Sequence, residues 1–364
     1  MTTTPPARRP YRYLLAGGGT AGHVNPLLAV ADGLRARDPE ATVLVLGTAE
    51  GLESRLVPRR GYPLLIVDKV PFPRRLNRAA LTFPGRFRRA VAQVRRHLNE
   101  HEIDVVIGFG GYASAPAYLA AHRAGISYLV HEANAKPGLA NVFGARRAAA
   151  VGVAFPGTPL RAGELVGMPL RTEITGLDRA ARRAEAAQYY GLDPNRNTLL
   201  VFGGSLGAAR LNEAFVDAGP AINGVGWQLV HIVGDRSSLS DSSHDGIVIR
   251  RYEDRMDLAF ALADLVVSRA GAATVSEISA LGIPAVYVPY AVGNGEQAQN
   301  AADSVRRGAA ILIPDSELTG DRVRSEIISL LHDRTRQQAM RDAAQNAGIR
   351  QGTQNMITLI DRVL

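Results

Sequence analysis

The chain has 364 residues, of which 46% are hydrophobic and 21% charged, and it contains no cysteine. This length favours two folded domains over one, and the lack of cysteine excludes disulfide bonds, thiolate metal ligands and cysteine nucleophiles. The formal net charge of +8 favours a polyanionic partner, such as nucleic acid, anionic lipid or a phosphorylated substrate. No apolar run approaches the ~20 residues of a membrane-spanning helix, so we expect a cytoplasmic protein unless a membrane surface holds it.

The first half of the chain alternates short apolar runs, glycine-rich or polar loops, and helical patterns. A turn is predicted at residues 17–22, and a helix with one apolar face follows from Asn25 onward. Buried strands are predicted at residues 11–16, 42–46, 104–107 and 127–131. Repeated strand-loop-helix units of this kind predict a parallel sheet covered by helices.

The second half repeats the pattern after a charged helical segment at residues 178–190. Its strands are predicted at residues 198–202, 228–233, 247–250, 265–267 and 285–288. A helical tail follows from near Asp321. We therefore expect two similar α/β domains, 1–170 and 171–345, joined near residues 168–178, and a C-terminal helical segment, 346–364, that could pack back on the first domain.

The first glycine loop, "AGGGTAGHVNP", matches the G-x-G-x-x-G pattern through Gly17, Gly19 and Gly22. The pattern suits a dinucleotide, a sugar or phosphate, or only a tight turn between strand and helix. An NAD site would also need an acid at the end of the second strand, where Glu50 is a displaced candidate. His23, in the first turn of the following helix, is a candidate general base because the helix dipole disfavours its protonated form.

Two further loops follow predicted strands. In "HEANAKPG", His131, Glu132 and Asn134 are either ligand-binding residues or members of a hydrogen-bonded network that orders the loop. In "GGSLGAAR", consecutive backbone N–H groups, the Ser205 hydroxyl and a helix dipole predict a diphosphate site. No Lys-Ser/Thr pair follows these glycines, which argues against an NTPase.

The stretch "SRAGAATVSEISALGIPAVYVP" contains a strand, a glycine turn and a helix. Thr274 and Glu277 have the spacing of a capping box, but the Glu277 carboxylate could equally bind both hydroxyls of a ribose. The later "NGEQAQNA" adds Glu296, Gln297 and Asn300, which are side chains of the kind that bind sugar hydroxyls. No Asp-x-Asp motif, HExxH motif or clustered histidine pair is recognised, so no metal-bound nucleotide and no metal ligand is expected.

Residues 69–96 contain nine basic and no acidic residues, interleaved with Phe72, Leu76, Leu81, Phe83 and Phe87. This pattern predicts either an interfacial patch for a membrane surface or a solvated basic helix over an ordinary core.

Seven stretches together resemble one family. In chain order they are "GGGTAGHVNP", "GFGGYASAP", "HEANAKPG", "VGMPLRTE", "FGGSLGAAR", "AGAATVSEISALGIPAVYVPY" and "GNGEQAQNA". They resemble the GT-B glycosyltransferases of peptidoglycan synthesis that transfer N-acetylglucosamine (GlcNAc) from UDP-GlcNAc to the undecaprenyl-pyrophosphate-linked muramoyl-pentapeptide, lipid I. The resemblance spans about residues 11–345. It implies two Rossmann-like doubly wound domains facing across a cleft, whose closure would exclude water.

The resemblance implies an inverting, metal-independent transfer that forms a β-1,4 bond and releases lipid II and UDP, without a cofactor. It assigns the acceptor and the membrane contact to the first domain and the UDP-sugar to the second. The enzyme would be peripheral on the cytoplasmic face of the cell membrane, held there through residues 69–96. No nucleic-acid partner is implied.

The same resemblance supplies candidate site residues. The expected substrate-binding residues are Thr20, Ala21, Gly22, Asn134, Arg171, Ser205, Glu253, Ala272, Thr274, Glu277, Glu296 and Gln297. The first three would line the transferred sugar, Arg171 and Ser205 would face the diphosphate, and Glu277 would bind the ribose. The backbone around Glu253 would lie near the uracil, Asn134 near the donor sugar, and Gln297 on the sugar hydroxyls. His23 is the candidate base.

Two positions depart from the commonest family pattern, because Glu296 and Leu206 stand where glutamine is frequent.

Three other functions compete with the glycosyltransferase interpretation. An NAD-dependent oxidoreductase explains the first loop alone, a nucleic-acid-binding protein explains the charge alone, and a GT-B enzyme with a soluble acceptor is the nearest rival.

Overall fold

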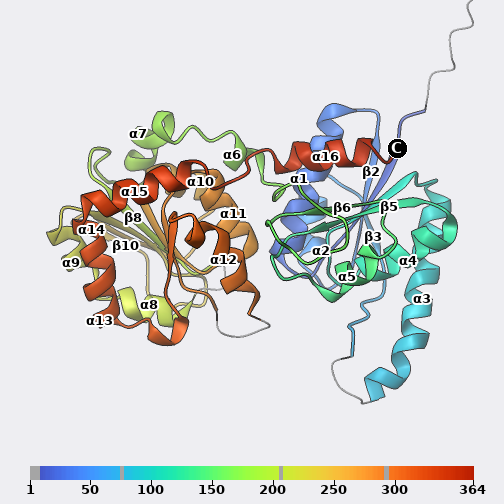
Figure 1. Cartoon of the computed structure of the whole chain (residues 1–364), viewed down its shortest axis with the longest axis horizontal. Coiled ribbons are helices and arrows are strands. Elements are labelled where there is room, and N and C mark those ends of the chain that lie inside the picture. The colour runs from blue at the N-terminus through green and yellow to red at the C-terminus, as the bar shows by residue number, and fades with distance from the viewer. Residues whose placement is uncertain (1–8, 74–77, 205–207, 291–294) are drawn as a thin grey trace, which may run out of the picture. The chain divides into compact units, whose positions relative to one another are not determined.

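The computed structural model describes residues 9–73, 78–204, 208–290 and 295–364 (Figure 1). Its contacts divide the chain into two compact units. The first unit comprises the described residues up to Pro169 together with Gln351–Leu364, and the second unit comprises Leu170–Arg350.

The first unit is built on a seven-stranded sheet in which every neighbouring pair of strands is parallel. Its strands are β1 (Arg12–Ala16), β2 (Thr42–Gly47), β3 (Leu64–Ile66), β4 (Val105–Gly108), β5 (Ser127–Glu132), β6 (Ala150–Val153) and β7 (Gly163–Leu165). They lie in the order β3-β2-β1-β4-β5-β6-β7. The first six repeat the 3-2-1-4-5-6 order of the Rossmann fold, so the direction of the strand order reverses between β1 and β4.

Helices cover both faces of this sheet. They are α1 (Ala21–Arg37), α2 (Glu53–Arg59), α3 (Arg78–Glu100), α4 (Ser114–Ala124), α5 (Leu139–Ala145) and α16 (Gly352–Asp361). Successive residues of β1 point to opposite faces, because side chains alternate along a strand. Leu14 joins one core cluster with Val91 of α3, and Leu15 joins the other with Leu27 of α1.

The C-terminal helix α16 belongs to the first unit, where it packs against α1 and β6 (Figure 1). Ile357 and Thr353 of α16 lie directly over Gly33 of α1, where a Cβ would stand 2.6 Å from the Ile357 Cδ1 atom. Met356, Ile357, Leu359 and Ile360 are all buried. The chain therefore leaves the first unit at residue 169 and returns to complete its core.

The second unit repeats the same architecture. Its strands are β8 (Thr198–Phe202), β9 (Gln228–Ile232), β10 (Ser242–His244), β11 (Ile247–Arg250), β12 (Leu265–Ser268), β13 (Ala285–Tyr287) and β14 (Ala310–Leu312). They lie in the order β10-β11-β9-β8-β12-β13-β14, and only β10 is antiparallel to its neighbour. The strand order reverses between β8 and β12, as it does between β1 and β4 in the first unit.

Short helices surround this second sheet. They are α6 (Thr172–Thr175), α7 (Arg179–Tyr190), α8 (Ala209–Phe215), α9 (Gly219–Gly224), α10 (Met256–Leu262), α11 (Ala272–Ala280), α12 (Glu296–Arg306), η1 (Asp315–Glu317), α13 (Gly320–Arg322), η2 (Val323–Ile328), α14 (Ser329–His332) and α15 (Arg334–Gln345). Asp178 caps α7 by accepting a hydrogen bond from the Ala181 N–H, as a residue of its type does at a helix start.

The predicted fold class, α/β with two Rossmann-like doubly wound domains, is confirmed by these two sheets. The predicted strands lie within two residues of the observed ones. The first helix is a correction: α1 begins at Ala21 rather than at Asn25, so Gly22 lies in its first turn. The sequence did not predict β6, which has four residues, or β3, β7, β10 and β14, which have three residues each, and all five pair at or near the sheet edges. Among the described residues, no helix is both long and apolar enough to span a bilayer.

Candidate active site

Two glycine loops meet at the point where the strand order of the first sheet reverses. One follows β1 and contains Gly18, and the other follows β4 and contains Gly111. A Cβ at Gly111 would lie 2.3 Å from the carbonyl oxygen of Gly18, and the φ angle of Gly111 is +81°. Only glycine allows this backbone-to-backbone contact. In open α/β sheets, ligands bind beyond the carboxyl ends of the strands at such a point.

A buried carboxylate hydrogen-bonds the backbone of the first glycine loop. Glu53, at the start of α2, is fully buried. Its Oε2 accepts a hydrogen bond from the Gly19 N–H (2.8 Å), and its Oε1 accepts from the Thr48 N–H (2.9 Å) and hydroxyl (2.8 Å). Burial raises the pKa of Glu53, but these backbone and hydroxyl hydrogen bonds outweigh it and leave the pKa below its usual value. The carboxylate is therefore an internal anion of the loop.

Glu53 replaces the acid expected from the sequence. Glu50 is 73% exposed and pairs with Lys69 at 3.3 Å, so it does not reach the glycine loop. A Cβ at Gly18 would lie 2.3 Å from the Glu53 carboxylate, which shows how closely the two pack. The Gly19 N–H that a dinucleotide pyrophosphate would need is taken by Glu53, which weighs against the dinucleotide interpretation.

His23 lies in the first turn of α1 and is partly buried. Its Nδ1 lies 3.1 Å from the Gly18 carbonyl oxygen and 3.3 Å from the Thr20 hydroxyl. A carbonyl oxygen only accepts, so the Gly18 contact places a proton on Nδ1 and leaves the Nε2 lone pair to accept one. A Cβ at Gly110 would lie 3.1 Å from that Nε2. The imidazole is thus oriented as a proton acceptor beside the second loop.

The residues around His23 are accessible. Thr20 is the N-cap residue of α1, and its side chain makes no capping hydrogen bond to the helix. Thr20 and Ala21 are exposed, and Gly22 is partly exposed. These three predicted residues therefore line a solvent-facing surface next to the imidazole.

The loop after β5 is mainly a hydrogen-bonded network. The Glu132 carboxylate accepts from the N–H groups of Asn134 (2.9 Å) and Gly138 (3.0 Å) and from the Asn141 amide (2.9 Å). His131 is fully buried and hydrogen-bonds the Gly167 carbonyl at 3.1 Å; burial lowers its pKa to about 4. His131 and Glu132 thus order the loop, while Asn134 is only partly buried.

A pocket of about 230 Å³ lies at the carboxyl ends of β8 and β9 in the second unit. Its lining includes three predicted site residues, Arg171, Glu253 and Glu277, together with Gly204 of the "GGSLGAAR" loop that follows β8. Ser205 and Leu206 of that loop lie outside the described residues. The pocket occupies the position that corresponds to the first unit's glycine loops, because β8 is the central strand where β1 is in the first sheet.

An ion pair forms one wall of this pocket. Arg171 Nη2 lies 3.1 Å from Glu277 Oε1, and the Glu277 side chain is 14% exposed. Burial raises the pKa of Glu277, and the guanidinium of Arg171 offsets part of that rise. The buried Nε of Arg171 has no hydrogen-bond partner in the described part of the chain. The wall therefore offers a carboxylate acceptor and a guanidinium donor side by side.

The predicted capping box is not formed. Helix α11 begins at Ala272 with Gly271 as its N-cap, so Thr274 and Glu277 both lie inside the helix. Glu277 pairs with Arg171 instead of capping the helix. Ala272 is the buried first residue of α11, at the carboxyl end of β12.

The Glu253 side chain points into the protein rather than to a ligand. Its carboxylate accepts hydrogen bonds from the hydroxyls of Tyr189 (3.2 Å) and Tyr190 (2.9 Å) and from the Arg255 N–H (2.7 Å). Glu253 is 7% exposed. These bonds engage the carboxylate, so residues 251–254 line the pocket without offering the Glu253 side chain to it, and a contact of their backbone with uracil stays a prediction.

The start of α12 holds Glu296 and Gln297. Gln297 Oε1 accepts from the backbone N–H groups of Ala270 (3.2 Å) and Tyr290 (2.9 Å). Its carbonyl is thus engaged, so the group it could present to a ligand is its NH₂ donor. Glu296 is the first residue of the helix and is partly exposed. Asn300 is buried and donates to the Ala270 carbonyl at 3.2 Å, a structural role.

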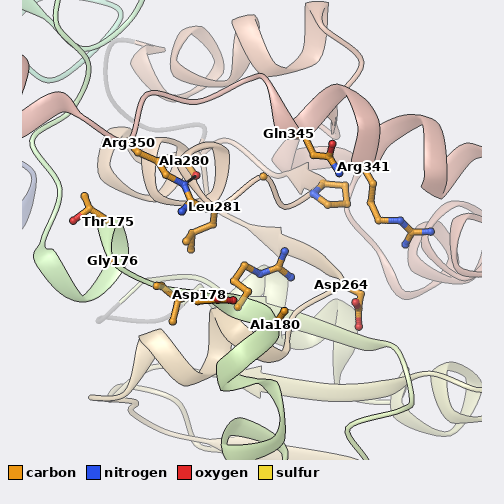
Figure 2. Close-up of a pocket in the computed structure, with 14 residues that line it drawn as sticks. Thr175, Gly176, Asp178, Ala180, Asp264, Ala280, Leu281, Arg341, Gln345 and Arg350 are labelled. Carbon is orange, nitrogen blue, oxygen red and sulfur yellow. Dashed lines mark hydrogen bonds between the residues drawn. The ribbon is translucent and has the colours of Figure 1, made fainter.

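A larger cavity of the second unit lies elsewhere. It measures about 560 Å³, and its lining includes Asp178, Asp264, Leu281, Arg341 and Arg350 (Figure 2). Asp264 directly precedes β12, so this cavity is at the amino ends of the strands. None of the predicted site residues lines it, and the smaller pocket is the better candidate site.

The expectation that the chain has no metal-ligating cluster needs one correction. His97, Glu100 and His101 have ligand atoms that all lie within 4.8 Å of one another. The expectation of no clustered histidine pair is wrong, because the "HLNEH" stretch holds two histidines four residues apart, in an order that the HExxH pattern does not match.

Residues 69–96 fall largely on α3. Phe72, Phe83 and Phe87 form a ring cluster with centroids 5.3 to 6.4 Å apart. Leu81 is 82% exposed, and no residue of 80–89 is buried, whereas Ala90, Val91, Val94 and Leu98 are. Figure 1 shows the first turns of α3 standing away from the sheet. Arg74, Arg75 and Leu76 lie outside the described residues.

The repeated strand order, with a polar pocket at one reversal point and a histidine at the other, defines a two-domain nucleotide-binding architecture of the kind found in GT-B glycosyltransferases. The models of the "Glycosyltransferase family 28 N-terminal domain" and the "Glycosyltransferase family 28 C-terminal domain" match residues 13–153 and 198–356. The chain therefore belongs to glycosyltransferase family 28 and is a glycosyltransferase.

Individual proteins similar to this chain are more specific than the family models. The chain is 57% identical over 350 residues to a protein of Clavibacter sepedonicus, covering 96% of this chain and 95% of that one. It is 53% identical over 348 residues to one of Leifsonia xyli, covering 96% and 97%. Both are named "UDP-N-acetylglucosamine--N-acetylmuramyl-(pentapeptide) pyrophosphoryl-undecaprenol N-acetylglucosamine transferase". The crystal structure of Acinetobacter baumannii MurG is 28% identical, covers 97% of this chain and 100% of its own, and has a TM-score of 0.76.

Proposed function

We propose that this protein transfers GlcNAc from UDP-GlcNAc to the muramoyl-pentapeptide of undecaprenyl-linked lipid I, forming lipid II and UDP. High identity to transferases of that name over nearly the whole chain supports the reaction. The structural observation that carries it is the pocket of the second unit, where Arg171 and Glu277 form a wall suited to a nucleoside diphosphate. By this proposal the second domain binds the UDP-sugar, and the first binds the acceptor.

The donor would be held by charge and hydrogen bonds without a metal. Glu277 would accept hydrogen bonds from both ribose hydroxyls, since an ionised carboxylate is an acceptor only. Arg171 and Ser205 would face the diphosphate, together with the first turns of α8 and α11. The fixed backbone at Glu253 would contact the uracil, and Thr274 and Ala272 would shape the nucleotide site.

The chemistry would start from His23. The Nε2 lone pair takes the proton of the acceptor's C4 hydroxyl as that oxygen bonds to the anomeric carbon of GlcNAc. The bond between the anomeric carbon and UDP breaks, its electron pair leaves with UDP, and the configuration inverts. Negative charge that develops on the diphosphate is stabilised by Arg171 and Ser205.

The remaining predicted residues would position the transferred sugar. Gln297 would donate its NH₂ group to a sugar hydroxyl, and Glu296 would accept from one, where the commonest family residue would be glutamine. Thr20, Ala21, Gly22 and Asn134 would line the sugar on the side of the first unit.

We propose that residues 69–96 bind an anionic membrane surface, at the cytoplasmic face. The exposed Leu81 and the phenylalanine cluster would enter the interface, and the arginines would pair with anionic headgroups. An acceptor with an undecaprenyl chain stays in the bilayer, so such a surface brings the enzyme to its substrate.

Transfer of radiolabelled GlcNAc from UDP-GlcNAc to lipid I tests the reaction directly. We expect labelled lipid II and UDP, and transfer only to a soluble acceptor would instead support the rival GT-B function. In a thermal unfolding assay, UDP at ~100 times its dissociation constant should stabilise the protein by about 2.7 kcal/mol. NAD should not stabilise it, because Glu53 occupies the amide that a dinucleotide would need.

Charge reversal tests the membrane surface. A variant with glutamate at four arginines of the patch should lose binding to vesicles of anionic lipid and keep its affinity for UDP. These arginines are Arg74, Arg75, Arg78 and Arg86. The matched control reverses four exposed arginines of the second unit, which are Arg306, Arg307, Arg334 and Arg336. Equal loss in both variants, or no loss in the first, contradicts the assignment.

A further inference from the structure

A histidine and carboxylate cluster at the end of α3 has no part in the proposed transfer. His97 and Glu100 lie in the last turn of the helix, and His101 follows it with its N–H bonded to the His97 carbonyl at 3.1 Å. Residues three and four apart share one face of a helix. The ligand atoms of the three side chains all lie within 4.8 Å of one another, and the two imidazole rings are stacked with centroids 6.3 Å apart.

The hydrogen bonding of His97 prepares one of its nitrogens for a ligand. Its Nε2 lies 3.2 Å from the Ile66 carbonyl oxygen, at the end of the short strand β3. A carbonyl oxygen only accepts, so this contact places the proton on Nε2 and the lone pair on Nδ1. A histidine that binds a metal characteristically donates its other N–H to a carbonyl or carboxylate in this way.

The Nδ1 atom of His97 is buried, and it has no hydrogen-bond partner in the described part of the chain. A buried polar atom without a partner is uncommon and costly in a folded protein. Glu100 Oε2 lies 3.9 Å from this atom, and the Glu100 side chain is 62% exposed. The carboxylate therefore has the freedom to rotate toward an ion bound at Nδ1.

We propose that His97, Glu100 and His101 bind a divalent transition-metal ion, with Zn²⁺ as the best match. Two imidazole nitrogens and one carboxylate oxygen form an established zinc donor set, with a fourth position open to water. Mg²⁺ and Ca²⁺ prefer all-oxygen ligands and fit this site poorly. The ion would be held at the end of α3 by His97, whose other ring nitrogen is bonded to the Ile66 carbonyl of β3, and it has no part in the proposed transfer reaction.

Zinc titration of the untagged full chain tests the site by calorimetry. We expect one Zn²⁺ per chain, at least a tenfold loss of affinity in His101→Asn, and a smaller loss in Glu100→Gln. The control is His122→Asn, which removes an exposed histidine from the last turn of a different helix, α4, and should bind like the wild type. Mg²⁺ should give no binding heat.

A second measurement guards against misfolded variants. Zn²⁺ should raise the thermal midpoint of the wild type and of His122→Asn but not that of His101→Asn, whose midpoint without metal should match the wild type because its ring makes no bond to β3. Cobalt added in place of zinc should give a visible absorption band that His101→Asn loses. The proposal is wrong if the wild type takes up no zinc, or if His101→Asn takes it up with unchanged affinity.

Discussion

The two units share a core of six parallel strands whose order reverses beside β1 in one and beside β8 in the other, but what occupies the reversal point differs. In the first unit, a protein carboxylate, Glu53, accepts the N–H of Gly19 and fills the space behind the glycine loop. In the second unit, the corresponding position opens into a pocket walled by Arg171 and Glu277. The first unit thus places its own carboxylate behind its glycine loop, whereas the second unit has a cavity at the corresponding position. A glycine loop after a strand therefore predicts a tight turn, and the side chains packed around that loop decide whether a phosphate can bind there.

The largest expected effect separates chemistry from donor binding. His23→Ala should lower kcat by roughly 1,000-fold, because a positioned base contributes about that much. The KM of this variant for UDP-GlcNAc and its stabilisation by UDP should not change, since the pocket proposed for the donor lies in the second unit. Steady-state kinetics with lipid I and thermal unfolding with UDP measure both. A tenfold or greater rise in the KM for UDP-GlcNAc would contradict the separation of roles, in which the first unit acts in the chemistry and the second binds the donor.

The next effect tests the internal anion. Glu53→Gln places an NH₂ donor against the N–H of either Gly19 or Thr48, because both carboxylate oxygens accept backbone hydrogen bonds. The first glycine loop, whose Gly18 carbonyl accepts the hydrogen bond of the His23 Nδ1–H, should therefore shift. A displacement of about 1 Å costs on the order of 100-fold in rate, so kcat should fall by about that factor. Glu50→Gln, three residues away and exposed, is the control and should keep full activity. Equal kcat values for the two variants would show that the carboxylate does not position the loop.

The third effect belongs to the second unit. Glu277→Gln should raise the KM for UDP-GlcNAc by about tenfold, because a hydrogen bond to a charged acceptor contributes about 1.5 kcal/mol or more. The kcat value should change far less, and Glu317→Gln, an exposed glutamate of the same unit, should match the wild type. A variant that loses kcat at constant KM would move Glu277 from donor binding to the chemistry.

The sequence predicted the fold well because its central strands are continuous apolar runs followed by glycine, and this pattern is local. It missed Glu53, because a glutamate in "LESRLVP" has the pattern of an ordinary helix surface. The available signal was the set of glycines at 18, 47 and 51, each of which packs against that one side chain. Distance from the strand end pointed instead to Glu50, which is exposed.

The donor site was only partly predictable for a related reason. Arg171 and Glu277 are 106 residues apart, and only the family resemblance grouped them before the fold brought them together. Spacing alone left a capping box and a ribose-binding role equally open for Glu277, because the sequence does not show that α11 begins at Ala272. The tyrosine contacts that turn the Glu253 side chain inward are likewise long-range.

The smallest expected effect applies to both units alike. Burial lowers the pKa of His131 in the first unit and of His231 in the second, each to about 4. The unfolded chain takes up these protons near pH 6.5, whereas the folded chain takes them up only near pH 4. The free energy of unfolding is therefore highest above pH 6.5 and falls as the pH is lowered from 6.5 toward 4. Each histidine contributes a slope of about 1.4 kcal/mol per pH unit within that window. Urea unfolding midpoints at pH 7 and pH 5 should therefore differ less in His231→Gln than in the wild type, whereas His244→Gln, an exposed histidine, should leave the difference unchanged.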